Sequence, residues 1–87
     1  MTHNLKTWPA YFDAVFEGRK NFEIRRNDRD YQVGDVLHLE KYDPDSGEYD
    51  GSYLNSRVTY IVHGPQFGIL EGFCVMGIEP EDHAPRS

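Results

Sequence analysis

Apolar residues at helical spacing mark one helix near the start of the chain. Four of them recur every three or four positions and predict a stripe that packs into the core: Trp8, Phe12, Val15 and Phe16. Pro9 suits the first turn of a helix and Gly18 suits its end, so the helix is predicted over residues 8–17. The short segment 3–7 before it is predicted to be extended.

The polar and apolar positions after this helix alternate one by one, which is typical of a strand. Over residues 21–27, Phe22 and Ile24 alternate with Glu23 and Arg25. Successive residues of a strand lie on opposite faces, so we expect the two apolar side chains on the core side. Glu23 and Arg25 then share the opposite face.

Turn-forming residues separate three further strands. These are predicted at residues 36–39, 54–63 and 73–78. The segment 42–49, rich in Asp, Pro and Gly, predicts a hairpin loop between the first two. In the second of these strands, Val58, Tyr60 and Val62 fall on one side. The third is nearly all apolar, so we expect it to be covered on both faces.

One helix followed by several short strands predicts the fold class. We expect a mainly β (α+β) single domain over residues 1–80, a small closed or nearly closed β-barrel, with a flexible tail at 81–87. Val, Ile, Thr and aromatic residues number 25, against 8 for Ala and Leu together. That balance favours strands and excludes a helical bundle.

Three features bear on where the protein acts. No apolar run approaches the roughly 20 residues that a membrane-spanning helix needs. The start of the chain has no signal-peptide pattern. Cys74 is the single cysteine, so no internal disulfide can form. We therefore expect a cytoplasmic protein with no membrane partner.

Charge is distributed unevenly along the chain, whose net charge is −6. Residues 1–29 hold six of the nine basic residues and carry a net charge of +2, whereas residues 30–87 carry −8. An acidic protein is a poor nonspecific nucleic-acid binder, because neutralising phosphates requires clustered Lys and Arg. Binding of a nucleic-acid ligand would therefore require a local basic site on a protein that is acidic elsewhere.

The usual catalytic and metal-binding motifs are missing from the sequence. The four histidines show no i, i+2 or i, i+4 pairing, and Cys74 has no cysteine partner. No Gly-rich phosphate-binding motif is present. We therefore expect neither a metal nor a cofactor.

The candidate chemistry lies in segment 18–29, where charged residues gather. Lys20 follows the predicted end of the helix, and Glu23 and Arg25 project together from the next strand. Arginine offers paired N–H donors to a phosphate or a base edge, and glutamate accepts a hydrogen bond from an amino group. The alternative interpretation is an exposed strand with ordinary surface ion pairs.

This segment also carries a resemblance. Residues 18–25, Gly-Arg-Lys-Asn-Phe-Glu-Ile-Arg, resemble the G-x-K-x-x-E-x-R signature of ASCH domains in the PUA-like superfamily. Residues 33–37, Val-Gly-Asp-Val-Leu, are similar to the V-G-D-x-L that begins the next barrel strand there. The opening residues, the turn 27–30 and the strand 60–62 resemble a small bacterial and phage subfamily of unknown function. The similarity spans about residues 3–79.

The resemblance implies a PUA-like β-barrel with the helix beside a cleft that binds RNA or a nucleotide. Lys20, Glu23 and Arg25 match the ASCH signature and are expected to line this cleft. The first strand is expected beside the signature strand. Four more candidate ligand-binding residues match the subfamily pattern only: His3, Lys6, Asp28 and Arg29.

The first functional hypothesis is a module that binds RNA or a modified nucleotide. Three cations would contact phosphate: Lys6, Arg25 and Arg29. Glu23 would contact a base edge, and Tyr31 or Trp8 would stack on the base.

Two alternatives stand beside it. Some ASCH relatives hydrolyse an N-acylated cytidine or cleave single-stranded RNA, so the resemblance also allows a small nucleoside or RNA hydrolase with Lys20 and Glu23 as catalytic residues. Glu23 stands where the amidohydrolases have a Thr nucleophile. The other alternative is a ligand-free factor that binds a protein through an apolar patch in segment 64–73.

Overall fold

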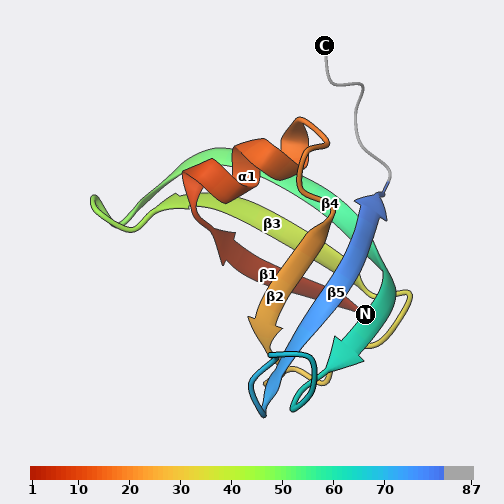
Figure 1. Cartoon of the computed structure of the whole chain (residues 1–87). Coiled ribbons are helices and arrows are strands. Elements are labelled where there is room, and N and C mark those ends of the chain that lie inside the picture. The colour runs from red at the N-terminus through yellow and green to blue at the C-terminus, as the bar shows by residue number, and fades with distance from the viewer. Residues whose placement is uncertain (82–87) are drawn as a thin grey trace.

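Five strands form one mixed sheet that curls around the core, and a short helix lies across its rim (Figure 1). The computed structural model describes residues 1–81. Its elements in chain order are β1 (Thr2–Thr7), α1 (Pro9–Phe16), β2 (Phe22–Arg26), β3 (Val36–Asp43), β4 (Glu48–His63) and β5 (Phe73–Pro80). This part of the chain is therefore mainly β with one helix, which confirms the predicted α+β class.

The two edges of the sheet are β1 and β2, because the strand order is β1-β3-β4-β5-β2. β1 runs parallel to β3, and the other neighbouring strands are antiparallel. The curl brings the two edges close enough for Arg25 on β2 to donate to the Lys6 carbonyl oxygen on β1 at 3.1 Å. Arg29 donates to the Asn4 carbonyl oxygen of β1 at 2.9 Å.

The gap between β1 and β2, here called the seam, leaves the predicted barrel open on one side. Within residues 1–81, no strand pairing joins these two edges. Arginine side chains span the seam instead, so the sheet is a curled half-barrel. An open edge of this kind leaves backbone groups without ladder partners, and side-chain donors satisfy part of that need.

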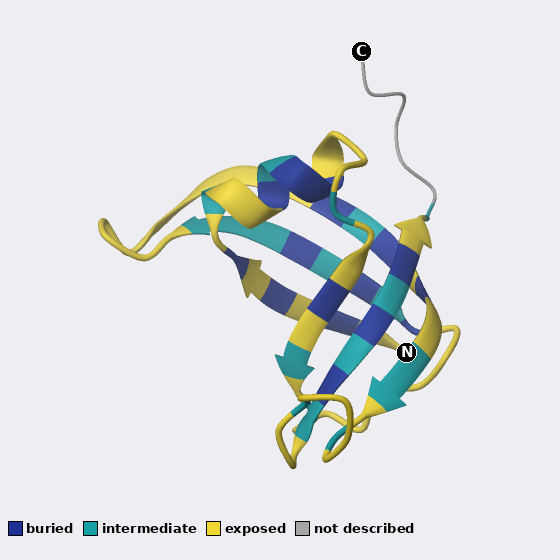
Figure 2. Ribbon diagram, viewed as in Figure 1, coloured by how far each residue is buried: buried dark blue, intermediate teal, exposed yellow. Residues whose placement is uncertain are grey.

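The hydrophobic core fills the concave side of the sheet, beneath the helix. Figure 2 shows buried and exposed residues alternating along β1, and buried and half-buried residues alternating along most of β5. The core combines residues from the helix, from four of the strands and from the segment before β3: Leu5, Phe12, Val15, Tyr31, Leu37, Leu39, Leu54, Val58, Cys74, Met76 and Ile78. Strand β2 adds no apolar side chain to this cluster, which matters for the site.

Helix α1 begins and ends one residue inside its predicted limits. Phe12 and Val15 are buried as predicted, but Trp8 and Phe16 are 52% and 41% exposed. Trp8 is the N-cap residue, with extended backbone, so it does not share the helical face of the other two. The predicted stripe of four is therefore wrong at both ends, because a two-turn helix on a rim buries only its central face.

Strand β2 has the opposite orientation to the one its pattern predicts. Glu23 is 3% exposed, whereas Phe22 and Ile24 are 41% and 58% exposed. Glu23 lies opposite the buried Met76 of β5 in the antiparallel register, and directly opposed residues point to the same face. Glu23 and Arg25 do share a face, but that face is the concave one.

Strands β4 and β5 also depart from their predicted patterns. The register of β4 against β5 shifts between Val58 and Tyr60, so Val58 is fully buried whereas Tyr60 is 68% exposed. A bulge adds one residue to a strand and thereby reverses its alternation. Strand β5 alternates between buried and half-buried residues, so the expected cover on both faces is wrong.

The far end of the described chain remains attached to the sheet. The Glu81 amide donates to the Asn55 carbonyl oxygen at 3.0 Å. The tail predicted at 81–87 lies, from residue 82 onward, outside the described residues. Within residues 1–81 there is no helix with the length and apolar character needed to cross a membrane.

Candidate functional site

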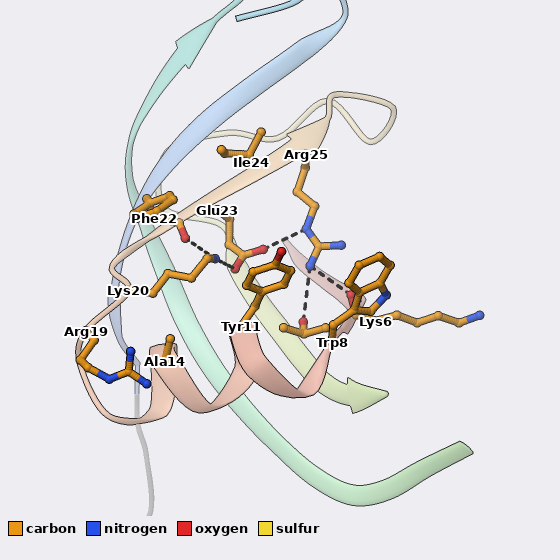
Figure 3. Close-up of a pocket in the computed structure, with 11 residues that line it drawn as sticks. Lys6, Trp8, Tyr11, Ala14, Arg19, Lys20, Phe22, Glu23, Ile24 and Arg25 are labelled. Carbon is orange, nitrogen blue, oxygen red and sulfur yellow. Dashed lines mark hydrogen bonds and ion pairs between the residues drawn. The ribbon is translucent and has the colours of Figure 1, made fainter. Parts of the chain in front are cut away.

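A buried carboxylate between two cations forms the centre of the candidate site (Figure 3). Lys20 Nζ donates to Glu23 Oε1 at 2.6 Å, and Arg25 Nε donates to Glu23 Oε2 at 2.9 Å. The side chains of Lys20 and Arg25 are 16% and 24% exposed. A carboxylate this deeply buried needs such partners, because removing its hydration without replacement is costly. We call these three residues the charged triad.

Local backbone geometry places the triad. Gly18 adopts a left-handed conformation (φ 81°), which ends helix α1 and turns the chain toward β2. The backbone amide of Lys20 then donates to the Ala14 carbonyl oxygen at 3.0 Å, which fixes Lys20 against the end of the helix. The period of two along β2 places Glu23 and Arg25 on one face.

The triad lines a cavity of about 690 Å³ beside helix α1. Eleven residues line it: Lys6, Thr7, Trp8, Tyr11, Ala14, Arg19, Lys20, Phe22, Glu23, Ile24 and Arg25. All of them come from segment 6–25. A volume of roughly 300–1,000 Å³ is typical of small-molecule sites, so one nucleotide fits this space.

Two aromatic side chains, from the N-cap and the first turn of α1, form one wall of the cavity. The rings of Trp8 and Tyr11 are stacked, with centroids 6.1 Å apart and planes at 18°. Trp8 is 52% and Tyr11 51% exposed, so both rings are accessible to a ligand. Lys20 Nζ lies 5.8 Å from the Tyr11 ring centroid. The cavity thus joins an aromatic surface to the charged triad.

Both cations of the triad retain hydrogen-bond donors for a ligand. Lys20 Nζ has two acceptors within residues 1–81, Glu23 and the Phe22 carbonyl oxygen, which leaves one of its three hydrogens. Arg25 uses Nε and Nη2, and its Nη1 has no acceptor in the described part of the chain. With one negative and two positive groups, the triad carries a net charge of +1.

The structure separates the predicted binding residues into two groups. Lys6, Lys20, Glu23 and Arg25 line the cavity, although the Lys6 side chain extends away from the triad (Figure 3) and its Nζ lies 4.7 Å from the Tyr42 ring centroid. The other three lie outside the cavity: His3, Asp28 and Arg29. Arg29 instead bridges the seam. Asp28 is exposed beside Arg29, at 4.0 Å.

His3 belongs to a different polar cluster, at the start of β1. Its side chain is 5% exposed and donates from Nε2 to Asp35 Oδ2 at 2.8 Å. Burial by itself raises the pKa of Asp35, but hydrogen bonds from His3, the Gln32 amide and the N-terminal ammonium outweigh it. The pKa of Asp35 is therefore below its ordinary value. This cluster fastens the segment before β3 to β1.

The aromatic partner is found on the helix. Tyr31, one of the two predicted stacking residues, is 2% exposed and packs edge-on against His3 at 4.8 Å, so it cannot stack on a ligand. Trp8, the other, lines the cavity. Tyr11 was not predicted for this role. Tyr11 lies in the first turn of α1, three residues after Trp8, and this closeness in the sequence is the signal that could have identified it.

Two further observations concern metal-ligating side chains and the protein-interaction alternative. Within residues 1–81 no group of three metal-ligating side chains converges. The loop between β4 and β5 exposes Phe67 (89%) and Leu70 (69%), as the protein-interaction alternative expects. That alternative also expects no cavity at the charged cluster, whereas a cavity is present.

Comparisons with known proteins place the chain among relatives of undefined role. It is 39% identical over 57 residues to a protein of Escherichia phage P2 described as an uncharacterized 12.9 kDa protein in the GpA 3′ region. The aligned part covers 66% of this chain and 50% of that protein, so the chain spans about half the length of the curated relative it matches. Residues 2–78 match a family described as a domain of unknown function, DUF3850. The matched part includes the charged triad and every other residue that lines the cavity. Because the match spans nearly the whole chain, the chain belongs to the DUF3850 family.

Proposed function

We propose that this chain is a PUA-like, ASCH-type domain that binds RNA or a modified nucleotide in the cavity beside helix α1. The observation that carries the proposal is the position of the charged triad directly beside the accessible Trp8 and Tyr11 rings, in a cavity of nucleotide size. Recognition of single nucleotides in RNA combines base stacking on aromatic rings with hydrogen bonds to the base edge and phosphate. A cytoplasmic location, where such ligands are abundant, is part of this proposal.

Each part of the cavity has a role in this mechanism. The base stacks on Trp8 or Tyr11, at a stabilisation of about 1–3 kcal/mol per base. Glu23 accepts from an exocyclic amino group through the lone pairs that Lys20 and Arg25 leave open. The spare donors of Lys20 and Arg25 bind the phosphate.

The test uses the fact that Trp8 is the only tryptophan in the chain. A base stacked on Trp8 quenches its fluorescence, so titration with nucleosides, nucleotides and short RNAs measures binding at the proposed position. We expect quenching, and Arg25→Gln should weaken the affinity about tenfold or more, because it removes charge-assisted hydrogen bonds.

Arg26→Gln is the matched control. Arg26 follows Arg25 on the same strand, lies outside the cavity and has its guanidinium carbon 4.9 Å from the Phe73 ring centroid. Its substitution should leave the affinity unchanged. Absence of quenching and of any rise in melting temperature across the whole panel would refute the proposed function.

A second candidate function rests on the 2.6 Å contact between Lys20 and Glu23. In an N-acylcytidine hydrolase, Glu23 would take a proton from water as the water attacks the acyl carbonyl, and Lys20 would stabilise the developing oxyanion. The C–N bond would then break as Glu23 returns the proton to the departing amino group. Both oxygens of Glu23 already accept from cations, which favours binding over this chemistry. Incubation with N-acylated cytidine and with single-stranded RNA, followed by chromatography, tests it: product formation that Glu23→Gln abolishes would establish the hydrolase instead.

A further inference from the structure

We propose that the unit recognised in the cavity is one nucleotide with one phosphate group, and that neither a polyphosphate nor a longer RNA chain binds more tightly. This inference rests on the proposed function and specifies its ligand class. It follows from the charge of the site, from the number of donors that remain, and from the engagement of the neighbouring cations.

The charge of the triad sets the first limit. Glu23 is 3% exposed and contacts both cations, so its negative charge acts inside the site and is not screened by bulk water. The net charge of +1 offsets only part of the charge of one phosphate monoester, which is about −1.5 to −2 at pH 7. A second phosphate would meet no uncompensated positive charge there.

The remaining donors set the second limit. One hydrogen of Lys20 and the two of Arg25 Nη1 are free of acceptors within residues 1–81. Three hydrogens can serve the oxygens of one phosphate group, but they leave no donor of the triad for a second phosphate. Arg25 is also fixed in orientation by its bonds to the Lys6 carbonyl oxygen and Thr7 Oγ1, at 3.1 and 3.4 Å. A donor that is already fixed loses little entropy on binding.

The surroundings set the third limit, because three neighbouring cations each already contact another group of the protein. Arg19 donates to Glu17 at 2.7 Å, and Arg29 to the Asn4 carbonyl oxygen at 2.9 Å. The Lys6 ammonium lies over the Tyr42 ring. Beyond the cavity, a nucleic-acid chain faces a protein with a net charge of −6. Additional phosphates would therefore have to displace one of these contacts to gain one of their own, and they would face the negative charge of the rest of the protein.

The experiment compares ligands that differ only in phosphate number. Trp8 fluorescence is titrated with cytidine, CMP, CDP and CTP, with the matching adenosine, guanosine and uridine series, and with single-stranded oligonucleotides of increasing length. We expect the best-bound series to gain about tenfold in affinity from nucleoside to monophosphate, the gain of a charge-assisted hydrogen-bonded contact. Further phosphates or nucleotides should change affinity less than about threefold, and salt dependence should not steepen with length.

Charge variants test the reason for this limit. Glu23→Gln raises the net charge of the triad to +2 and frees one of the two donors that contacted the carboxylate, because the amide nitrogen of glutamine cannot accept. The diphosphate should then bind more tightly than the monophosphate. Glu48→Gln makes the same change on an exposed residue at the start of β4, outside the cavity, and should leave the order of affinities unchanged. If Glu23→Gln fails to fold, Lys20→Met provides the second variant, since it brings the triad to zero charge and should remove the advantage of the monophosphate.

The possible outcomes separate the two proposals. A triphosphate or long oligonucleotide that binds tenfold more tightly than the monophosphate overturns this inference and leaves the proposed function standing. Equal affinity for nucleoside and monophosphate also overturns this inference and leaves the proposed function standing. Binding of none of these probes overturns both.

Discussion

Glu23 shows how a single residue can override the pattern around it. Alternation places apolar residues inside, yet a carboxylate occupies the inner position of β2 because Lys20 and Arg25 replace its hydration. Such an arrangement stabilises the fold only while both partners are present. Removal of one partner from a buried pair is far more costly than removal of a partner from an exposed pair.

Two lysines allow the cost of losing a partner to be compared between a buried and an exposed carboxylate. Lys20→Met should lower the free energy of unfolding by about 1–3 kcal/mol, because it deprives buried Glu23 of a partner. Lys41→Met removes a lysine that contacts Asp13 at 3.0 Å, where the carboxylate is 49% exposed, and should cost about 1 kcal/mol or less. Urea titrations of both variants provide the comparison. Equal losses of unfolding free energy in the two variants would show that the burial of Glu23 does not determine the cost of removing its partner.

A second residue, Asp35, predicts a dependence of stability on pH. Its pKa is lowered in the folded protein, so the unfolded chain binds more protons at acidic pH, and stability is lost as the pH falls through the lowered pKa. Asp35→Asn should therefore reduce the free energy of unfolding by about 1–3 kcal/mol at neutral pH. The difference in unfolding free energy between this variant and the wild type should become smaller at acidic pH. Urea titrations across this range test the prediction, and Asp28→Asn, on a 61% exposed side chain, should match wild type throughout.

At the scale of the element, helix α1 divides its side chains between two tasks. Its central face packs into the core through Phe12 and Val15, while Trp8 and Tyr11 line the cavity. The helix joins the core to the candidate site, and substitutions on its two faces should have separate effects.

The two phenylalanines of the helix test this division. Phe12→Ala should lower the free energy of unfolding by about 3–5 kcal/mol, the usual loss for a buried phenylalanine. Phe16→Ala should cost about 1 kcal/mol, because Phe16 is 41% exposed. Thermal and urea unfolding of both variants gives the difference. A loss at Phe16 as large as that at Phe12 would contradict the observed burial.

The elements themselves could be predicted from the sequence to a large extent, because their ends are marked locally. Pro9 and Gly18 delimit the helix, and the turn-rich segment 44–47 marks the hairpin between β3 and β4. Orientation could not be predicted, since it depends on what lies opposite. The burial of Glu23 requires cations supplied by the helix end and by its own strand, and the exposure of Tyr60 follows from a bulge in β4. The grouping of the triad could be predicted, because Glu23 and Arg25 share a strand face, Lys20 follows the end of the helix, and all three match the ASCH signature that the segment resembles.

At the scale of the whole molecule, the seam is the weakest line of the sheet. β1 is held by strand pairing only along β3, and across the seam by side chains of Arg25 and Arg29. A strand with ladder partners on one side is expected to open more readily than a central strand such as β4.

Hydrogen exchange should show this order of opening. Amides of β1 should exchange faster than those that β4 shares with β3 and β5. Arg29→Gln should speed exchange in β1 by a further two- to tenfold or so, the effect of one lost hydrogen bond, without changing β4. NMR-detected exchange measures both, with Arg26→Gln as the control. Uniform acceleration across the sheet would show that Arg29 contributes to global stability instead.

Every residue that lines the cavity comes from segment 6–25, while β3, β4 and β5 contribute none. The cavity is therefore lined by one continuous stretch of chain, whose two ends are held by the pairing of β1 with β3 and of β2 with β5. Under the proposed function, ligand preference depends on the positions of this stretch that line the cavity, whereas Phe12 and Val15 of the same stretch pack into the core. A chimera that exchanges the cavity-lining positions of segment 6–25 between two members, with Phe12 and Val15 kept, should accordingly transfer ligand preference.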